Sequence, residues 1–288
     1  MNELPPPLWR ARQAAHERRV DRLVGPHLAR RARGEKHAVE DFLFTYYSLR
    51  PARLRRWHPG AGVTLILDDG RRESLDVAAF LARRGEAVGH FADLLRATAS
   101  RPAHLGCFGL HEWAMVYKHG ADDERRHPAQ LRLGAAGSDA VVEAHRIRCS
   151  HFDAFRFFTP DAMGRNELQP TRERQIELEQ PGCLHATMDL YKWAYKLAPA
   201  TSSELIADCF ELARDARALD MQASPYDVRS LGYEPIPIET AEGKAAYVVR
   251  QRELIARAEP LRARLIEVCE ALLGTEALTE STTESITV

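Results

Sequence analysis

The sequence lacks most of the features that assign a protein to a functional class at once. No apolar run approaches the roughly eighteen residues that span a bilayer, and the N-terminus has no apolar core of a secretion signal. The net charge is only −1, which excludes a globally basic nucleic-acid binder. These absences predict a folded cytoplasmic protein with no membrane partner.

Cysteine pairs and the common catalytic loops are also missing. The five cysteines are an odd number, are widely spaced and form no CxxC, so we expect reduced thiols rather than disulfides. There is no GxSxG elbow, no GxxxxGK[ST] loop and no GxGxxG after a strand. No motif therefore supports assignment to the α/β-hydrolase, P-loop or Rossmann classes.

One segment has a clear β pattern. The sequence VTLILDDGRRESLDV places two short apolar or alternating stretches, 63–67 and 71–76, on either side of Asp69-Gly70. An Asp-Gly pair between two such stretches is typical of a tight hairpin turn. We expect a small β-hairpin near 63–76.

Helical patterns dominate the rest of the chain. In 203–221 apolar residues recur every three or four positions after Ser202 or Ser203 as N-cap, whereas the closing TEALTESTTESITV has no such period. The sequence predicts a mainly α fold: a single helical domain over 1–274 with the hairpin inserted, and a disordered tail over 275–288. The expected helices are 39–49, 77–84, 87–99, 110–118, 139–157, 184–197, 203–221 and 240–273.

Positive charge gathers near the N-terminus. Residues 1–60 hold 13 Lys or Arg against 6 Asp or Glu. Such a patch can neutralise phosphates of a polyanion, but a solvated helix face has the same composition. The DNA-binding hypothesis uses Arg30, Arg31, Arg33, Arg53, Arg55 and Arg56, with Arg146 and Arg148 from a later segment.

Comparison of the chain with itself reveals a repeat. Residues 110–118 and 184–192 both read L-H-x-x-x-x-[VL]-Y-K, and each follows a Gly-Cys pair. A third segment, Cys149-Ser150-His151, repeats the Cys-x-His opening. If these segments converge, they bring His111, His151 and His185 together, with Asp189 on the same helix face as His185.

Three imidazoles and a carboxylate suit Zn or non-haem Fe. HExxH and the Glu-x-x-His pairs of di-iron bundles are absent. The alternative is structural: the histidines cap helices or form hydrogen bonds in a polar core, and the cysteines act as small buried hydrophobes.

A metal-free chemistry fits the same region. Cleavage of an N-glycosidic bond to an alkylated purine needs one carboxylate to stabilise the sugar cation, and aromatic faces to stack on the base. Aromatic residues at helical spacing also simply form cores. The candidate acids are Glu112, Asp153 and Asp189, and the candidate pocket residues are Trp113, Tyr117, Phe152, Phe155, Tyr191 and Trp193.

Five long segments carry a resemblance. They are residues 34–62, 101–118, 132–160, 168–197 and 219–240, and over roughly 8–273 the chain is similar to a group of actinobacterial proteins commonly named 3-methyladenine DNA glycosylase. The resemblance implies removal of alkylated bases from DNA. It assigns no catalytic residue, because the helix-hairpin-helix with a trailing Asp, the HEAT-repeat alkylpurine pattern and the Gln-x-Gln motif of other glycosylases are absent.

Three functions follow as hypotheses. The first is a DNA-repair glycosylase, a hydrolase that needs no cofactor and takes duplex DNA as its partner. The second is a Zn- or Fe-dependent helical hydrolase or oxygenase that acts on a small-molecule substrate through His111, His151, His185 and Asp189 or Glu112. The third is a helical protein that binds DNA or another partner without catalysis.

Overall fold

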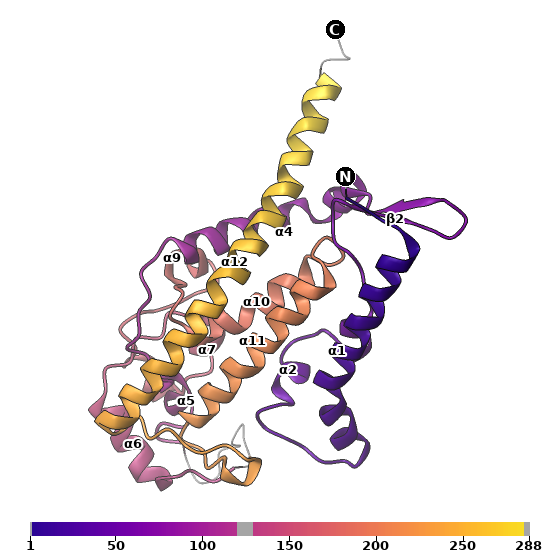
Figure 1. Cartoon of the computed structure of the whole chain (residues 1–288). Helices are drawn as coiled ribbons and strands as arrows, with labels where there is room; N and C mark the ends of the chain where they lie inside the picture. The colour runs from indigo at the N-terminus through magenta and orange to yellow at the C-terminus, as the bar shows by residue number, and fades with distance from the viewer. Residues whose placement is uncertain (1, 120–128, 285–288) are drawn as a thin grey trace.

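Helices form most of the chain in the computed structural model, which describes residues 2–119 and 129–284, with side chains as far as Thr275 (Figure 1). Within these residues 60% are helical, in twelve helices, and a small three-stranded mixed sheet accompanies them. The mainly helical fold with a β-hairpin is therefore confirmed. In chain order the elements are β1 (Asn2–Leu4), α1 (Pro6–Ala32), α2 (Phe42–Thr45), α3 (Pro51–Arg55), β2 (Val63–Ile66), β3 (Arg72–Ser74), α4 (Val77–Ala99), α5 (Leu110–Ala114), α6 (Gly134–Ala144), α7 (Phe152–Phe155), α8 (Pro160–Met163), α9 (Gln175–Leu178), α10 (Leu184–Lys196), α11 (Ser203–Gln222), a 3-10 turn (Arg229–Leu231) and α12 (Ala241–Glu284).

The centre of the fold is α10. Its residues from Leu184 to Tyr191 are all buried, which is the pattern of a helix surrounded by other elements rather than one with a solvent face. It packs along α11, while α12 packs on α4 and also touches α10 and α11 (Figure 1). The first helix, α1, contacts α11 from the other side. Side chains on any face of α10 between Leu184 and Tyr191 therefore lie inside the protein.

The clearest predicted helix, 203–221, is confirmed as α11. The Ser202 side chain accepts a hydrogen bond from the backbone N–H of Leu205 and caps the helix. The apolar stripe lies in the core, where Cys209 and Leu219 have no exposed surface. The predicted N-cap and the predicted core face of this helix are both correct.

The hairpin is also confirmed, with one addition. Strands β2 and β3 pair antiparallel, with Thr64 opposite Ser74, and Gly70 takes the left-handed φ of +78° that the turn needs. Strand β1 joins β2 in parallel. Sequence patterning missed this strand because three residues are too few to show an alternation.

Other helix boundaries differ from expectation. The predicted pair 77–84 and 87–99 is one helix, α4, whereas 139–157 is divided into α6 and α7. The break contains Ile147, which forms a β-bridge with Asn166 and thereby leaves the helical path. Over 39–49 only the short α2 is helical.

The last helix, α12, is much longer than its neighbours and projects beyond the bundle at its C-terminal end (Figure 1). It includes residues 275–284 of the predicted tail, and 285–288 lie outside the described residues. Among the described residues no helix is both long and apolar enough to cross a membrane.

We expect the packed part of α12 to stabilise the bundle. Leu265 is fully buried in the core, so Leu265→Ala should lower the free energy of unfolding by about 2–5 kcal/mol, as buried Leu-to-Ala changes do. Val249 is 57% exposed on the same helix, and Val249→Ala is the matched control, expected to change stability by no more than about 0.5 kcal/mol. Urea denaturation measures both; equal effects would show that α12 contributes no packing energy at Leu265.

Candidate metal centre

Two histidines lie in the core, and each follows a glycine whose position requires the absence of a side chain. His111 is the second residue of α5, which begins after Gly109 in the left-handed conformation, φ +72°. His185 is the second residue of α10, and the loop before it contains Gly182. A Cβ atom on Gly182 would lie 2.4 Å from the carbonyl oxygen of His104, so only glycine lets these two segments meet.

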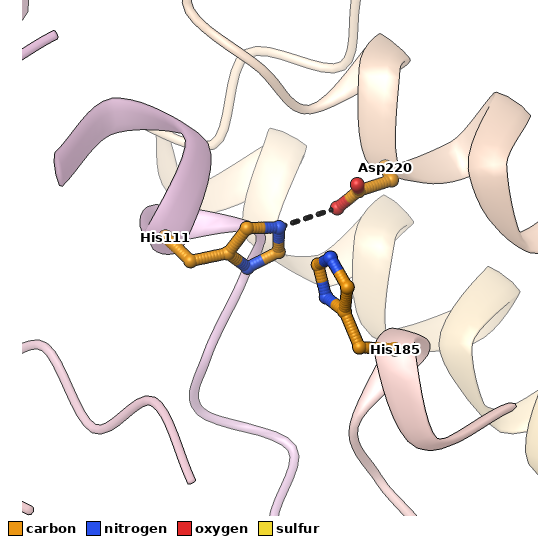
Figure 2. Close-up of side chains that lie close together, drawn as sticks. All are labelled: His111, His185 and Asp220. Atoms are coloured by element: carbon orange, nitrogen blue, oxygen red, sulfur yellow. Dashed lines mark ion pairs between the residues drawn. The ribbon is translucent and has the colours of Figure 1, made fainter. Parts of the chain in front are cut away.

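The third member of the site is Asp220, near the C-terminal end of α11. One nitrogen of His111, one of His185 and one carboxylate oxygen of Asp220 all lie within 4.8 Å of one another. Figure 2 shows the three side chains pointing toward a common centre from three different segments. All three residues are buried, with at most 6% of their surface exposed.

The His111–Asp220 contact has an unusual geometry. The Nε2 atom of His111 lies 2.9 Å from Oδ1 of Asp220 (Figure 2), yet within the described residues neither atom has a well-aligned hydrogen bond. Two ligand atoms, each about 2.1 Å from one metal ion, lie about 3 Å apart at a right angle and about 3.4 Å apart at a tetrahedral angle. The observed spacing fits the right-angled arrangement.

The electrostatics of the site favour one neutral and one charged imidazole. Burial and the neighbouring His111 lower the pKa of His185 well below its usual value. Burial also acts to lower the pKa of His111, but Asp220 outweighs it and the pKa rises. His185 is thus held neutral, as a metal ligand must be, whereas His111 would release its proton on binding an ion.

A buried arginine fixes the carboxylate. Nη1 of Arg217 donates to Oδ2 of Asp220 at 3.0 Å and to Oε1 of Glu112 at 2.8 Å, and its guanidinium rests on the ring of Phe42. Arg217 therefore turns the other oxygen of Asp220, Oδ1, toward His111. Partners of this kind around metal sites orient the ligands and tune their basicity.

A small cavity adjoins His111. It measures about 10 Å³, and Cys107, Cys149, Cys183 and Tyr247 are among its other lining residues. A space of this size holds about one water molecule. The Sγ atom of Cys107 lies 3.8 Å from Nδ1 of His111. Of the three residues of the site only His111 lines this cavity.

The third predicted histidine lies next to the group but belongs to a second cluster. The His151 ring stacks on His185 with centroids 5.2 Å apart, and its Nε2 atom is 3.5 Å from Asp189 and 3.7 Å from Glu179. Lys192 completes this cluster, with Nζ 2.8 Å from Asp189. The three histidine segments do converge in the structure, which places Asp189 beside His151 and Lys192, and Asp220 beside His111 and His185.

Asp220 was missed because the sequence does not show which helix packs across from α10. A signal was present: Asp220 continues the apolar stripe of Cys209, Ala213 and Ala216 at helical spacing. A carboxylate on the buried face of a helix, three residues after Arg217, marks a buried polar site rather than a solvated one.

The three carboxylates considered for glycosidic cleavage are all engaged by cations. Glu112 pairs with Arg217, and Asp153 and Asp189 share Lys192. Burial alone would raise the pKa of Asp189, but Lys192 and His151 outweigh it and lower it. Tyr47 also donates its hydroxyl to Asp189, at 3.0 Å. Asp153 and Asp189 are ionised, and all three carboxylates are partners in buried ion pairs.

The six aromatic residues predicted to line a base pocket are mainly core residues. Phe152 is half-buried and lies under Arg172. The other five, which belong to the main hydrophobic core, are Trp113, Tyr117, Phe155, Tyr191 and Trp193.

The eight arginines predicted to bind DNA divide into two groups. Within the described residues, three have no acidic partner: Arg31, Arg53 and Arg56. The other five are ion-paired, namely Arg30 with Glu40, Arg33 with Glu35, Arg55 with Asp21, and Arg146 and Arg148 with Glu167.

Removal of Arg217 should be strongly destabilising, because it leaves Asp220 and Glu112 buried without their cation. We expect Arg217→Met to lower the free energy of unfolding by about 3–5 kcal/mol, measured by urea denaturation at pH 7. Arg214 lies on the same helix with 40% of its side chain exposed, so Arg214→Met is the control and should cost less than about 1 kcal/mol. A loss below 1 kcal/mol for Arg217→Met would contradict a structural role of this cation.

The lowered pKa of Asp189 predicts an acid-sensitive contribution to stability. Below about pH 4 the unfolded chain binds a proton at this carboxyl, while the folded chain does not, so stability falls with pH by up to about 1.4 kcal/mol per unit from this group. Asp189→Asn should remove that slope between pH 4 and 3, whereas Asp93→Asn, with 67% of the side chain exposed, should retain it. Urea titrations at several pH values measure the slopes; an unchanged slope in Asp189→Asn would be the contrary result.

Comparison with known proteins gave no relative from which a role could be transferred. No protein-family model, no curated protein and no solved structure matches the chain. The resemblance to the glycosylase group stays a prediction, and the chemistry open to the site is inferred from its own side chains.

Proposed function

We propose that this protein is a metal-dependent enzyme whose single divalent ion is held by His111, His185 and Asp220. The observation that carries the proposal is the convergence of two imidazoles and one carboxylate in the core, with His111 Nε2 and Asp220 Oδ1 facing each other at 2.9 Å. Two imidazoles and a carboxylate around one buried centre form a donor set that a divalent ion can bind.

The donor set favours iron(II) over zinc. Two histidines and one carboxylate with open positions are typical of non-haem iron(II) oxygenases, and the same set with a water also serves zinc hydrolases. The 2.9 Å separation of the two ligand atoms matches a right angle better than a tetrahedral one. A bound ion of this kind supplies Lewis acidity and open positions for water or dioxygen.

The chain itself supplies the surroundings of the reaction. Arg217 holds Asp220 ionised and oriented, His185 stays neutral, and a cavity of about 10 Å³ adjoins His111. A cavity of that size has no room for a base flipped from DNA. The glycosylase reading has less support, because its three candidate acids are engaged in ion pairs.

Metal analysis tests the proposal. Protein purified without chelator, under air and anaerobically, should contain about one Fe or Zn per chain. His111→Gln, His185→Gln and Asp220→Asn should each lose most of it, because each variant removes one of three ligands. His90→Gln, an exposed histidine on α4, is the control and should keep full occupancy.

A second measurement separates metal loss from unfolding. Chelator-treated wild type should gain stability when Fe(II), Zn(II) or Co(II) is added, by about 2.7 kcal/mol at a hundredfold excess over Kd. The folded ligand variants should gain none. Two outcomes overturn the proposal: wild type that neither contains nor responds to any of these ions, or three folded variants that all retain full occupancy.

A further inference from the structure

A second site lies where α3, β2, β3 and the adjoining ends of α10 and α11 meet. A groove of about 1000 Å³ opens there, at the upper end of the size range of small-molecule sites. Its lining includes Lys196, the last residue of α10, whereas His185 lies near the start of that helix. Eleven residues of helix separate the two by about 16 Å, so the groove is distinct from the metal centre.

The groove carries an excess of positive charge. Five cations line it, Arg50, Arg53, Arg56, Arg84 and Lys196, against two carboxylates, Glu73 and Asp76. Asp76 is already engaged, because its side chain accepts a hydrogen bond from the backbone N–H of Ala79 and caps α4. The cations thus outnumber the acids by three.

None of the five cations forms an ion pair within the described residues, and three of them are arginines of one short segment. Arg50, Arg53 and Arg56 are exposed at the groove, and in the described part of the chain none of them pairs with an acidic side chain. This distinguishes them from neighbouring Arg55, which pairs with Asp21. The positive field extends to other groups on the wall: burial, Lys192 and Arg84 lower the pKa of Lys196, and burial, His16 and Arg56 lower that of His58 to about 4.

The remaining lining is apolar and aromatic. Trp57 and Tyr195 face the groove together with Leu54, Leu75 and Ile206. Guanidinium groups bind phosphate oxygens in a forked geometry, and aromatic or apolar walls bind a flat organic body. The walls therefore suit a molecule with an anionic end and a flat end, rather than a bare anion.

We propose that this groove binds a nucleoside diphosphate or a phosphorylated molecule of similar size and charge, with its phosphates on Arg50, Arg53 and Arg56. The excess of three positive charges is close to the charge of about −3 on a nucleoside diphosphate near neutral pH. A duplex of DNA fits less well, because the unpaired arginines sit within a concave groove, while most of the other arginines predicted to contact DNA are held in ion pairs.

Isothermal titration at 150 mM salt tests the proposal with ADP, adenosine, pyrophosphate and a 12-base-pair duplex as probes. Wild type should bind ADP, and should bind adenosine and pyrophosphate at least tenfold more weakly. The triple variant Arg50→Gln/Arg53→Gln/Arg56→Gln should weaken ADP binding at least tenfold. The matched control, Arg18→Gln/Arg22→Gln/Arg31→Gln, removes the same charge from exposed positions of α1 and should stay within twofold of wild type.

Each contrary result has a definite meaning. No ADP binding up to 1 mM, or equal weakening in both triple variants, overturns the site. If pyrophosphate binds as tightly as ADP, the groove does not recognise the organic part of the ligand. If the duplex binds more tightly than ADP, and only the groove variant loses this binding, the ligand is nucleic acid rather than a nucleotide. The groove variant should keep the metal content of wild type, so failure here is distinguishable from failure of the metal centre.

Discussion

Two buried cations, Arg217 and Lys192, determine how this core is built. Each lies on a central helix, is largely or fully buried, and binds two carboxylates that arrive from different segments. A buried carboxylate without a cation would cost several kcal/mol. Lys192 and Arg217 therefore hold α5, α7, α10 and α11 together around the histidines. They specify this arrangement more narrowly than apolar packing would, because each cation requires carboxylates at particular positions.

The two cations neutralise two separate groups of carboxylates. Arg217 neutralises Glu112 and one oxygen of Asp220, which leaves the other oxygen aimed at His111. Lys192 neutralises Asp153 and Asp189, beside His151. The histidine rings stack edge-to-face and face-to-face between these two clusters. The result is a polar layer through an apolar core, with one side suited to an ion and the other closed by an internal ammonium group.

Sequence patterning predicted what depends on local periodicity and repetition. The helical content, the hairpin at Asp69-Gly70 and the stripe of α11 follow from spacing within one segment. The repeated Leu-His motif drew attention to His111 and His185, but the sequence did not show whether the two segments meet. It did not yield Asp220, because the partner of a helix face depends on how helices pack and not on the spacing within either. Asp189 shares a face with His185 by spacing, yet its contacts are decided by Lys192 and Tyr47.

The three proposed ligands lie far apart along the chain, at positions 111, 185 and 220. No segment of the protein holds two of them within a single helix, so the ion has nothing to bind until α5, α10 and α11 have come together. During synthesis on the ribosome, a chain that ends before Asp220 has only an incomplete donor set. Metal binding would then occur late in folding and only in correctly assembled molecules, so metal occupancy would report the fraction of chains that have folded.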